Sequence, residues 1–493
     1  MDYINVTSPP PPHPPLLLLY CSAILLPIIL IFIFLKATKS SASNLPPGPP
    51  GWPLFGHIFT LKHLPHIQMA KMKEKYGPVV WLKIGSMNTM VVLTANAAAE
   101  VYKNHDLDFS NRYVLDTVTS HDYHKASILF SPYGPYWRMA RRLCNAGINS
   151  KLNDDSLRIR RKGVDDLLAW IAKEGEMNQE IKIVDFIFLS LINVMGNVIF
   201  SQDLVQPNSK IGSELFTGVT GFFHWISEPN ISDVFSWLKP FDLQGLKRNM
   251  DKDLGSGLKI VSGFIKERLE QKQGKQLQDG EKQRKDLLDV LLEFDGEGDD
   301  EPEKLSQHTI SIFCLELFFA SADTLSSTIE WALAELLRAP ENLVRVKDEM
   351  NMIIGPNRRF EERDIDNLPF LQAIIKETLR LHPPAPMIPK KSNKDTCFMG
   401  YDIPKDTQVI VNAWAIGRDT ECWNEPLSFK PERFMGSNID YKGQDFELIP
   451  FGAGRRMCAG FPLAHRLLPL IVGSLLHGFD WELKDSITID MTE

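Results

Sequence analysis

Apolar residues recur along most of this chain at the spacing of an α-helix. The longest such pattern runs from about Leu305 to Arg338 and stops before Pro340, and a shorter one covers Leu368–Leu381. This periodicity predicts helices with a buried face. Two β-rich runs around a short polar turn lie within Pro78–Thr94 and predict a hairpin, and a strand-like piece returns at Thr407–Asn412. The pattern predicts a mainly helical fold with small peripheral β-sheets.

The N-terminal region differs from the rest in being continuously apolar. Leu16–Leu35 is an uncharged run of 20 residues, and a helix of that length spans about 30 Å of bilayer core. Lys36 and Lys39 follow at once, so the positive-inside rule predicts that the bulk of the chain faces the cytosol. A cleaved signal peptide is the alternative, although the run is long and no basic segment precedes it.

These features predict three parts of the chain. Residues 1–35 form a lumenal tail and a transmembrane anchor, with the span at 16–35, and residues 36–55 form a basic, proline-rich hinge. Because proline fixes φ, the run PPGPP at 46–50 would stiffen that hinge. No internal linker divides residues 56–493, which we expect to form one cytosolic catalytic domain.

Composition excludes several classes of function. The chain has 493 residues, of which 44% are hydrophobic and 24% charged, and its net charge of -8 argues against nucleic acid as a partner. Its six cysteines are scattered and form no C-x-x-C pair. That usage is typical of a reducing compartment and not of a disulfide scaffold or a zinc site.

One of these cysteines lies among small residues with two arginines just before it. The run FGAGRRMCAG at 451–460 would let a flat macrocycle approach the backbone, and nearby N–H groups and cations favour a thiolate. A structural cysteine in a glycine-rich turn is the ordinary alternative. The run resembles the haem-binding loop F-x-x-G-x-R-x-C-x-G of the cytochrome P450 family, with fixed positions at Phe451, Gly454, Arg456, Cys458 and Gly460.

That resemblance implies a helix-rich haem-thiolate fold and roles for individual residues. Cys458 would be the axial ligand of the iron of haem b, with Phe451 covering the sulfur, and Arg456 would pair with a haem propionate. Thiolate ligation pushes electron density onto the iron and favours O–O cleavage.

Two further motifs stand at the positions that the resemblance leads us to expect. Glu377 and Arg380 share a helix face at i and i+3, and Arg433 follows in the sequence PERF. In the family these residues form a buried triad that braces the core next to the haem loop. The pattern E-x-x-R alone is common on surface helices, so its place ahead of the loop carries the interpretation.

The long helical pattern also contains FASADT at 319–324. In the family, the matching segment crosses the distal face of the haem, and an acid and a threonine form a proton relay. Asp323 and Thr324 occupy those positions, and a hydroxyl backed by a carboxylate is suited to proton transfer. Ser321 replaces the usual glycine, so its hydroxyl would either narrow the oxygen pocket or bond a helix carbonyl. Solvent-facing helix residues are the alternative for Asp323 and Thr324.

Other cations would face the haem propionates. Trp137 and Arg141 lie on one helix face at i and i+4, matching the W-x-x-x-R pair of the family. Lys390 stands where relatives usually carry an arginine, and its point charge lacks the bidentate fork of a guanidinium. By resemblance, Ser120–Ser131 and Thr217–Phe241 cap a mostly apolar substrate pocket, although plain core packing explains any single aromatic residue there equally well.

Together these features predict a membrane-anchored haem-thiolate monooxygenase. It would take electrons from NADPH through a flavoprotein reductase on the endoplasmic reticulum membrane and insert one oxygen atom from O2 into a small hydrophobic substrate. The chain most resembles the plant microsomal clan that oxidises monoterpenoids and alkaloid precursors, such as geraniol hydroxylases. A haem-thiolate isomerase or dehydratase, and a catalytically impaired haem-binding membrane protein, remain alternatives. The chain ends at Glu493, where we expect the last strand pair of the family to be missing.

Overall fold

The computed structural model describes residues 24–29, 44–53, 55–61, 64–149, 154–177, 180–275, 286–296, 300–483, 489 and 491. The described part is mainly helical, as the apolar periodicity predicts, with two small sheets. Elements labelled α are α-helices, and those labelled η are short 3-10 helices. Its first half contains α2 Pro65–Ala70, α3 Lys73–Tyr76, α4 Ala95–Lys103, η1 Thr117–Asp122, α5 Tyr123–Ala126, α6 Pro135–Asn149, α7 Asp154–Met177, α8 Ile183–Phe200, α9 Lys210–Ser227, α10 Ile231–Val234, η2 Ser236–Phe241 and α11 Leu246–Lys275.

The second half carries the long central helix and the elements around it. These are α12 Leu287–Leu292, α13 Gln307–Arg338, α14 Pro340–Ile353, η3 Glu362–Asn367, α15 Pro369–Leu381, α16 Ala413–Gly417, η4 Pro431–Phe434, η5 Gly454–Arg456 and α17 Phe461–Gly478. The two helical patterns named in the sequence therefore form α13 and α15, close to their predicted bounds.

The predicted hairpin is confirmed and belongs to a four-stranded sheet. Strands β1 (Val79–Ile84) and β2 (Met87–Val92) pair antiparallel. The sheet order is β1-β2-β6-β3, in which β6 (Gln408–Asn412) runs parallel to β2 and β3 (Met387–Lys391) runs antiparallel to β6. Two further strands, β4 (Thr396–Phe398) and β5 (Tyr401–Ile403), form a separate hairpin.

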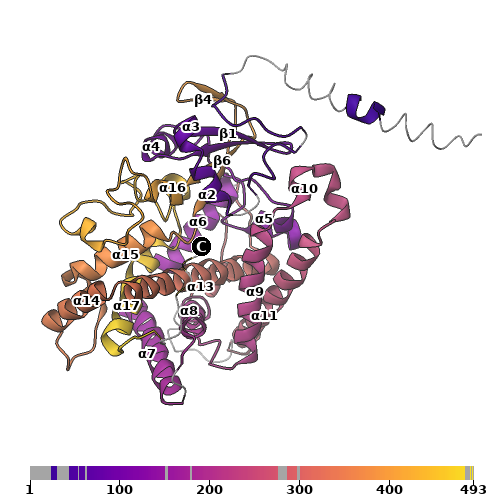
Figure 1. Cartoon of the computed structure of the whole chain (residues 1–493). Coiled ribbons are helices and arrows are strands. Elements are labelled where there is room, and N and C mark those ends of the chain that lie inside the picture. The colour runs from indigo at the N-terminus through magenta and orange to yellow at the C-terminus, as the bar shows by residue number, and fades with distance from the viewer. Residues whose placement is uncertain are drawn as a thin grey trace, which may run out of the picture.

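Helix α13 crosses the middle of the molecule and packs against α8, α9 and α11 (Figure 1). The four-stranded sheet lies above α13 in this view. The Ser306 hydroxyl caps its first turn by accepting from the Thr309 N–H. The helix ends at Arg338 because Pro340 cannot continue the hydrogen-bond ladder. Most of its side chains are buried, so this helix runs through the main hydrophobic core.

The predicted span at 16–35 lies outside the described residues except for 24–29, which are helical and exposed. Among the described residues, two helices are long and apolar enough to cross a membrane, namely α8 and α13. In the most apolar 18-residue stretch of each helix, 67% and 72% of the residues are buried inside the protein, as expected for core helices.

Candidate functional site

The cysteine loop (residues 451–460) contains η5 and leads into α17, and two of its glycines have backbone conformations that favour glycine. Gly452 and Gly454 both have a φ of 67°, in the left-handed region. A Cβ on Gly454 would also lie 2.7 Å from Oδ1 of Asp106, so this position has no room for a side chain. The Cys458 N–H donates to the Phe451 carbonyl at 2.9 Å and closes the loop.

The Cys458 thiol lies in the interior of the molecule, yet open space remains against its side chain. Burial raises the pKa of the Cys458 thiol. The backbone N–H groups of Gly460 and Phe461 and the Arg141 guanidinium act in the opposite direction and favour the thiolate. A sulfur that keeps accessible surface and has backbone N–H donors next to it is suited to bind a metal.

The middle of α13 also has accessible surface. Ala320 is exposed although its neighbours Phe318 and Phe319 are each only 1% exposed. The hydroxyl of Thr324 lies one turn further on and donates to the Ala320 carbonyl at 2.7 Å. The Ser321 hydroxyl donates to the Leu317 carbonyl at 2.8 Å. Of the two roles expected for it, this hydroxyl therefore bonds a helix carbonyl.

Asp323 lies beside this accessible surface and is mostly buried. Burial raises the pKa of its carboxyl group to about 6. Since the group titrates near neutral pH, it can hold or release a proton there. Burial and a raised pKa make Asp323 a candidate for proton transfer, and Thr324 is the next residue on the helix.

The structure brings together Glu377, Arg380 and Arg433. Arg380 donates from Nε to Oε2 of Glu377 at 2.7 Å and from Nη2 to Oε1 at 2.8 Å, and both side chains have no exposed surface. Arg433 donates from Nε to Oε1 of Glu377 at 3.0 Å. Further donors and acceptors, including the Lys430 N–H and the Gly417 carbonyl, complete the network. A buried ion cluster is tolerated when every member is hydrogen-bonded in this way.

Trp137 and Arg141, on α6, lie next to the cysteine loop. The Trp137 indole N–H donates to the Ile128 carbonyl at 2.9 Å, and the Arg456 guanidinium lies 4.8 Å from the centre of the Trp137 ring. Arg141 donates from Nη2 to the Cys458 carbonyl at 3.3 Å. Three predicted propionate partners therefore gather within one region.

Lys390 is buried on β3, and its protein partner is an acid that the sequence analysis did not identify. Its Nζ lies 3.3 Å from Oδ1 of Asp106 and 4.6 Å from the centre of the Tyr102 ring. Burial lowers the pKa of Lys390 to about 8, against the raising effect of Asp106. Lys390 is thus already paired within the protein.

Arg112 is a second residue of this region that sequence reasoning missed. It is 9% exposed, and its Nε donates to the Leu129 carbonyl at 3.3 Å. Its buried Nη1, and the buried Nε of Arg456, have no hydrogen-bond partner among the described residues. Burial lowers the pKa of Arg112 to about 10 and that of Arg456 to about 9. Two buried guanidinium groups with free donors fit an anionic group such as a carboxylate.

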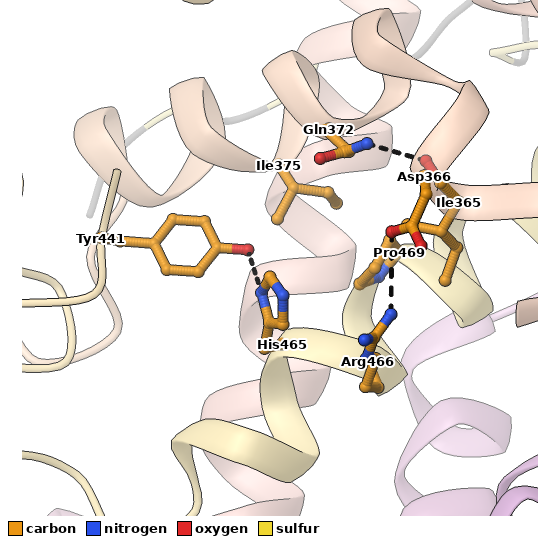
Figure 2. Close-up of a pocket in the computed structure, with 8 residues that line it drawn as sticks. All are labelled: Ile365, Asp366, Gln372, Ile375, Tyr441, His465, Arg466 and Pro469. Atoms are coloured by element: carbon orange, nitrogen blue, oxygen red, sulfur yellow. Dashed lines mark hydrogen bonds and ion pairs between the residues drawn. The ribbon is translucent and has the colours of Figure 1, made fainter. Parts of the chain in front are cut away.

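A small hollow lies on the Phe451 side of the loop, between α15 and α17 (Figure 2). Inside it, the Tyr441 hydroxyl approaches Nδ1 of His465 at 3.0 Å, and Arg466 faces Asp366 at 3.8 Å. The Tyr441 ring packs against Phe451 with ring centres 5.5 Å apart. Because the hollow is small and lined by polar and charged groups, it is a poor fit for a hydrophobic substrate.

Comparison with known proteins defines the class. Residues 46–493 match the family model described as Cytochrome P450. The chain belongs to the cytochrome P450 family, and it is a haem-thiolate monooxygenase whose electrons come from NADPH through a reductase. The confirmed fold is that of the family, and a zebra fish cytochrome P450 solved with progesterone shares it with a TM-score of 0.71 and 27% identity, covering 84% of this chain and 92% of that one.

The similar curated proteins are plant enzymes. Cytochrome P450 76A2 of Solanum melongena is 51% identical over 94% of this chain and 92% of its own length. Iridoid oxidase of Catharanthus roseus is 44% identical over 94% and 92%, and geraniol 8-hydroxylase of the same plant is 40% identical over 95% and 96%. These relatives agree with the predicted resemblance to the monoterpenoid-oxidising clan.

Proposed function

We propose that this monooxygenase oxidises a small terpenoid or a related hydrophobic precursor at the opening between the cysteine loop and α13. The observation that carries the assignment of the site is the Cys458 thiol, which lies in the interior with free space against it and backbone donors behind it. The relatives that act on geraniol and on iridoids support the substrate class.

The residues present fit haem b. Cys458 would ligate the iron, Phe451 would lie beside the sulfur, and Gly454 and Gly460 would keep the loop close to the macrocycle. The free donors of Arg112 and Arg456 would receive the propionates, with Trp137 and Arg141 next to them. When bound, the haem supplies the binding and cleavage of dioxygen.

Two polar residues of α13, Asp323 and Thr324, would deliver protons to this site. The Thr324 hydroxyl donates to the Ala320 carbonyl, and its oxygen can accept a hydrogen bond from a bound water. Asp323 would carry protons inward, because its raised pKa lets it alternate between its two forms near neutral pH. Such a relay favours oxygen-dependent chemistry over an isomerase or dehydratase.

Membrane anchorage through residues 16–35, with 36–55 as a hinge and 56–493 as the cytosolic catalytic body, is part of the same proposal. Supporting it, exposed aromatic side chains gather next to the start of the body. Phe55 packs against Phe235 with ring centres 5.9 Å apart, while Trp52 and Trp237 are 66% and 70% exposed. A patch of this kind beside an anchor is suited to rest on a bilayer surface of the endoplasmic reticulum.

Two measurements test the proposal. Reduced protein with carbon monoxide should show the red-shifted Soret band of thiolate-ligated haem, and Cys458→Ser should abolish it, whereas Cys314→Ser, at a buried cysteine on α13, should keep it. Titration with geraniol, iridoid precursors and alkaloid precursors should then give a spin shift of the haem and NADPH-dependent product. A normal band in Cys458→Ser would contradict the ligand, and an absence of turnover with every terpenoid would contradict the substrate class.

A further inference from the structure

Helix α13 carries two buried carboxylates that the proposed mechanism does not use: Glu335, which pairs with Arg338 and His382, and Glu316. Glu316 is 5% exposed and is the single charged side chain between His308 and Asp323. Burial raises the pKa of Glu316, while its hydrogen bonds act in the opposite direction. A carboxylate is costly to bury in an apolar helix, so its partners indicate why it is there.

Its partners are the Tyr123 side chain on α5 and three donors in the segment between α5 and α6. Oε1 of Glu316 accepts from the Ser127 hydroxyl at 2.5 Å and from the Leu129 N–H at 3.0 Å, and Oε2 accepts from the Ile128 N–H at 2.7 Å. The Ser127 hydroxyl in turn accepts from the Phe130 N–H at 3.0 Å. One side chain of α13 therefore fixes three consecutive residues of an irregular segment, which we call the 127–131 segment.

The carbonyl groups of the 127–131 segment point to the proposed propionate partners. The Ile128 carbonyl accepts from the Trp137 indole, and the Leu129 carbonyl accepts from Nε of Arg112 at 3.3 Å. Arg456 donates from Nη2 to the Ser131 carbonyl at 2.6 Å and from Nη1 to the Leu129 carbonyl at 3.4 Å. The N–H side of the segment thus binds Glu316, and its carbonyl side orients the three groups.

Glu316 also shares a helix face with the proposed oxygen site. Glu316, Ala320 and Thr324 follow one another at i, i+4 and i+8, so they form one stripe along α13. Since three protein donors already occupy its oxygens, the carboxylate is not available to bind substrate. Glu316 therefore links α13 to the cationic side chains around the cysteine loop.

We infer that Glu316 is a positioning residue, which acts through the 127–131 segment to hold Arg112, Trp137 and Arg456 toward the haem propionates. This inference rests on the proposed haem placement. Its physical reason is that a guanidinium reaches a carboxylate well only in a fixed orientation. When Glu316 cannot accept its three bonds, the segment loosens and the cations lose that orientation.

The test compares Glu316→Gln with Glu330→Gln, a matched change at an exposed carboxylate on the same helix. Hydrogen exchange of residues 127–131 should be faster in Glu316→Gln and unchanged in Glu330→Gln. Transfer of haem to apomyoglobin should be about tenfold faster, which is the lower end of what outer-shell partners of a metal group contribute.

The reduction potential of the haem separates positioning from a direct charge effect. Cations near the propionates stabilise the reduced haem, so loosening them should shift the potential downward, whereas removing a negative charge directly would shift it upward. An upward shift, or exchange as slow as in the wild type, would overturn the inference. If Glu316→Gln accumulates no haem, Ser127→Ala, which removes one donor only, should give the same changes in smaller size; wild-type behaviour there would also overturn it.

Failure of the site itself is distinguishable from failure of this inference. If Cys458→Ser keeps the thiolate band, the haem placement is wrong, and the exchange of the 127–131 segment still reports whether Glu316 holds it. If Cys458→Ser loses the band while Glu316→Gln leaves exchange, haem transfer and potential unchanged, the haem placement stands and the role of Glu316 fails.

Discussion

The Nζ atom of Lys390 lies 3.3 Å from Oδ1 of Asp106, and both side chains are buried. The other oxygen of Asp106 accepts from the Arg455 N–H at 2.9 Å and from Nη1 of Arg455 at 3.0 Å. Asp106 therefore joins strand β3 to the cysteine loop. The buried lysine of β3 is thus paired with an internal acid that also holds the cysteine loop.

This pair predicts a pH dependence of stability. Burial lowers the pKa of Lys390 to about 8, below its ordinary value of 10.5, so between these values the folded protein holds fewer protons than the unfolded chain. The free energy of unfolding contributed by Lys390 therefore rises as pH increases from about 8 to 10.5, by at most roughly 3 kcal/mol. Below pH 8, Lys390 is protonated in both the folded and the unfolded chain, so it contributes no pH dependence there.

Denaturant unfolding of wild type and Lys390→Met, on either side of the Lys390 pKa, measures this effect. The methionine side chain does not titrate, so the stability of the wild type should rise relative to Lys390→Met as the pH increases. A constant difference between the two proteins would show that Lys390 does not titrate there.

The ion network predicts a large effect from one substitution. Glu377→Ala leaves Arg380 buried without its carboxylate, which costs about 3–5 kcal/mol. We expect the variant to accumulate little haem-loaded protein, measured as the thiolate band per milligram. Glu432→Ala is the control, because Glu432 is half exposed and pairs with Arg345 at the surface. Equal haem loading in both variants would contradict a stabilising role for the network.

The long-range partners explain how far the sequence could predict this site. Helix α13 and the β1–β2 hairpin follow from local periodicity, and the cysteine loop follows from a contiguous motif. Arg112, Asp106 and Glu316 stand alone in the sequence, and their partners are 17, 349 and up to 189 residues away. Glu316 had one local signal, as a lone charge in an apolar helix, but only the fold shows which donors it meets.

Anchorage predicts how the protein behaves in membranes. Alkaline carbonate should not extract the full chain from microsomes, because insertion of a transmembrane helix is effectively irreversible. Added protease should digest the body and leave a short protected fragment that contains residues 16–35. A variant that lacks 16–35 should become extractable, with weak binding through the exposed aromatic patch at Trp52 and Trp237. Protection of the body in sealed vesicles would contradict the proposed orientation.

The last prediction concerns the hydroxyl of Thr324 and tests whether it takes part in proton delivery to the oxygen site. Thr324→Ala removes a hydroxyl beside the opening at Ala320, and the other side chains of that turn remain. We expect the variant to bind substrate and consume NADPH, but to release hydrogen peroxide in place of oxygenated product. The product formed per NADPH measures this coupling.

Thr328→Ala is the matched control, since Thr328 is buried one turn further along α13 and its hydroxyl donates to the Thr324 carbonyl. It should keep the coupling of the wild type. Ser321→Gly should have a small effect, because the Ser321 hydroxyl is already bonded to the Leu317 carbonyl. If Ser321 partly replaces the missing hydroxyl, the double variant Ser321→Gly with Thr324→Ala will uncouple more fully than the single one.

Asp323→Asn completes the test, because an amide cannot exchange protons as the carboxyl group does. In the wild type, burial raises the pKa of Asp323 to about 6, so the fraction of protonated acid falls as pH rises through that value. A coupling profile that bends near this pH should flatten in Asp323→Asn. If Thr324→Ala and Asp323→Asn both leave the product per NADPH unchanged, these residues carry no protons for the reaction, and the monooxygenase takes its protons by another route.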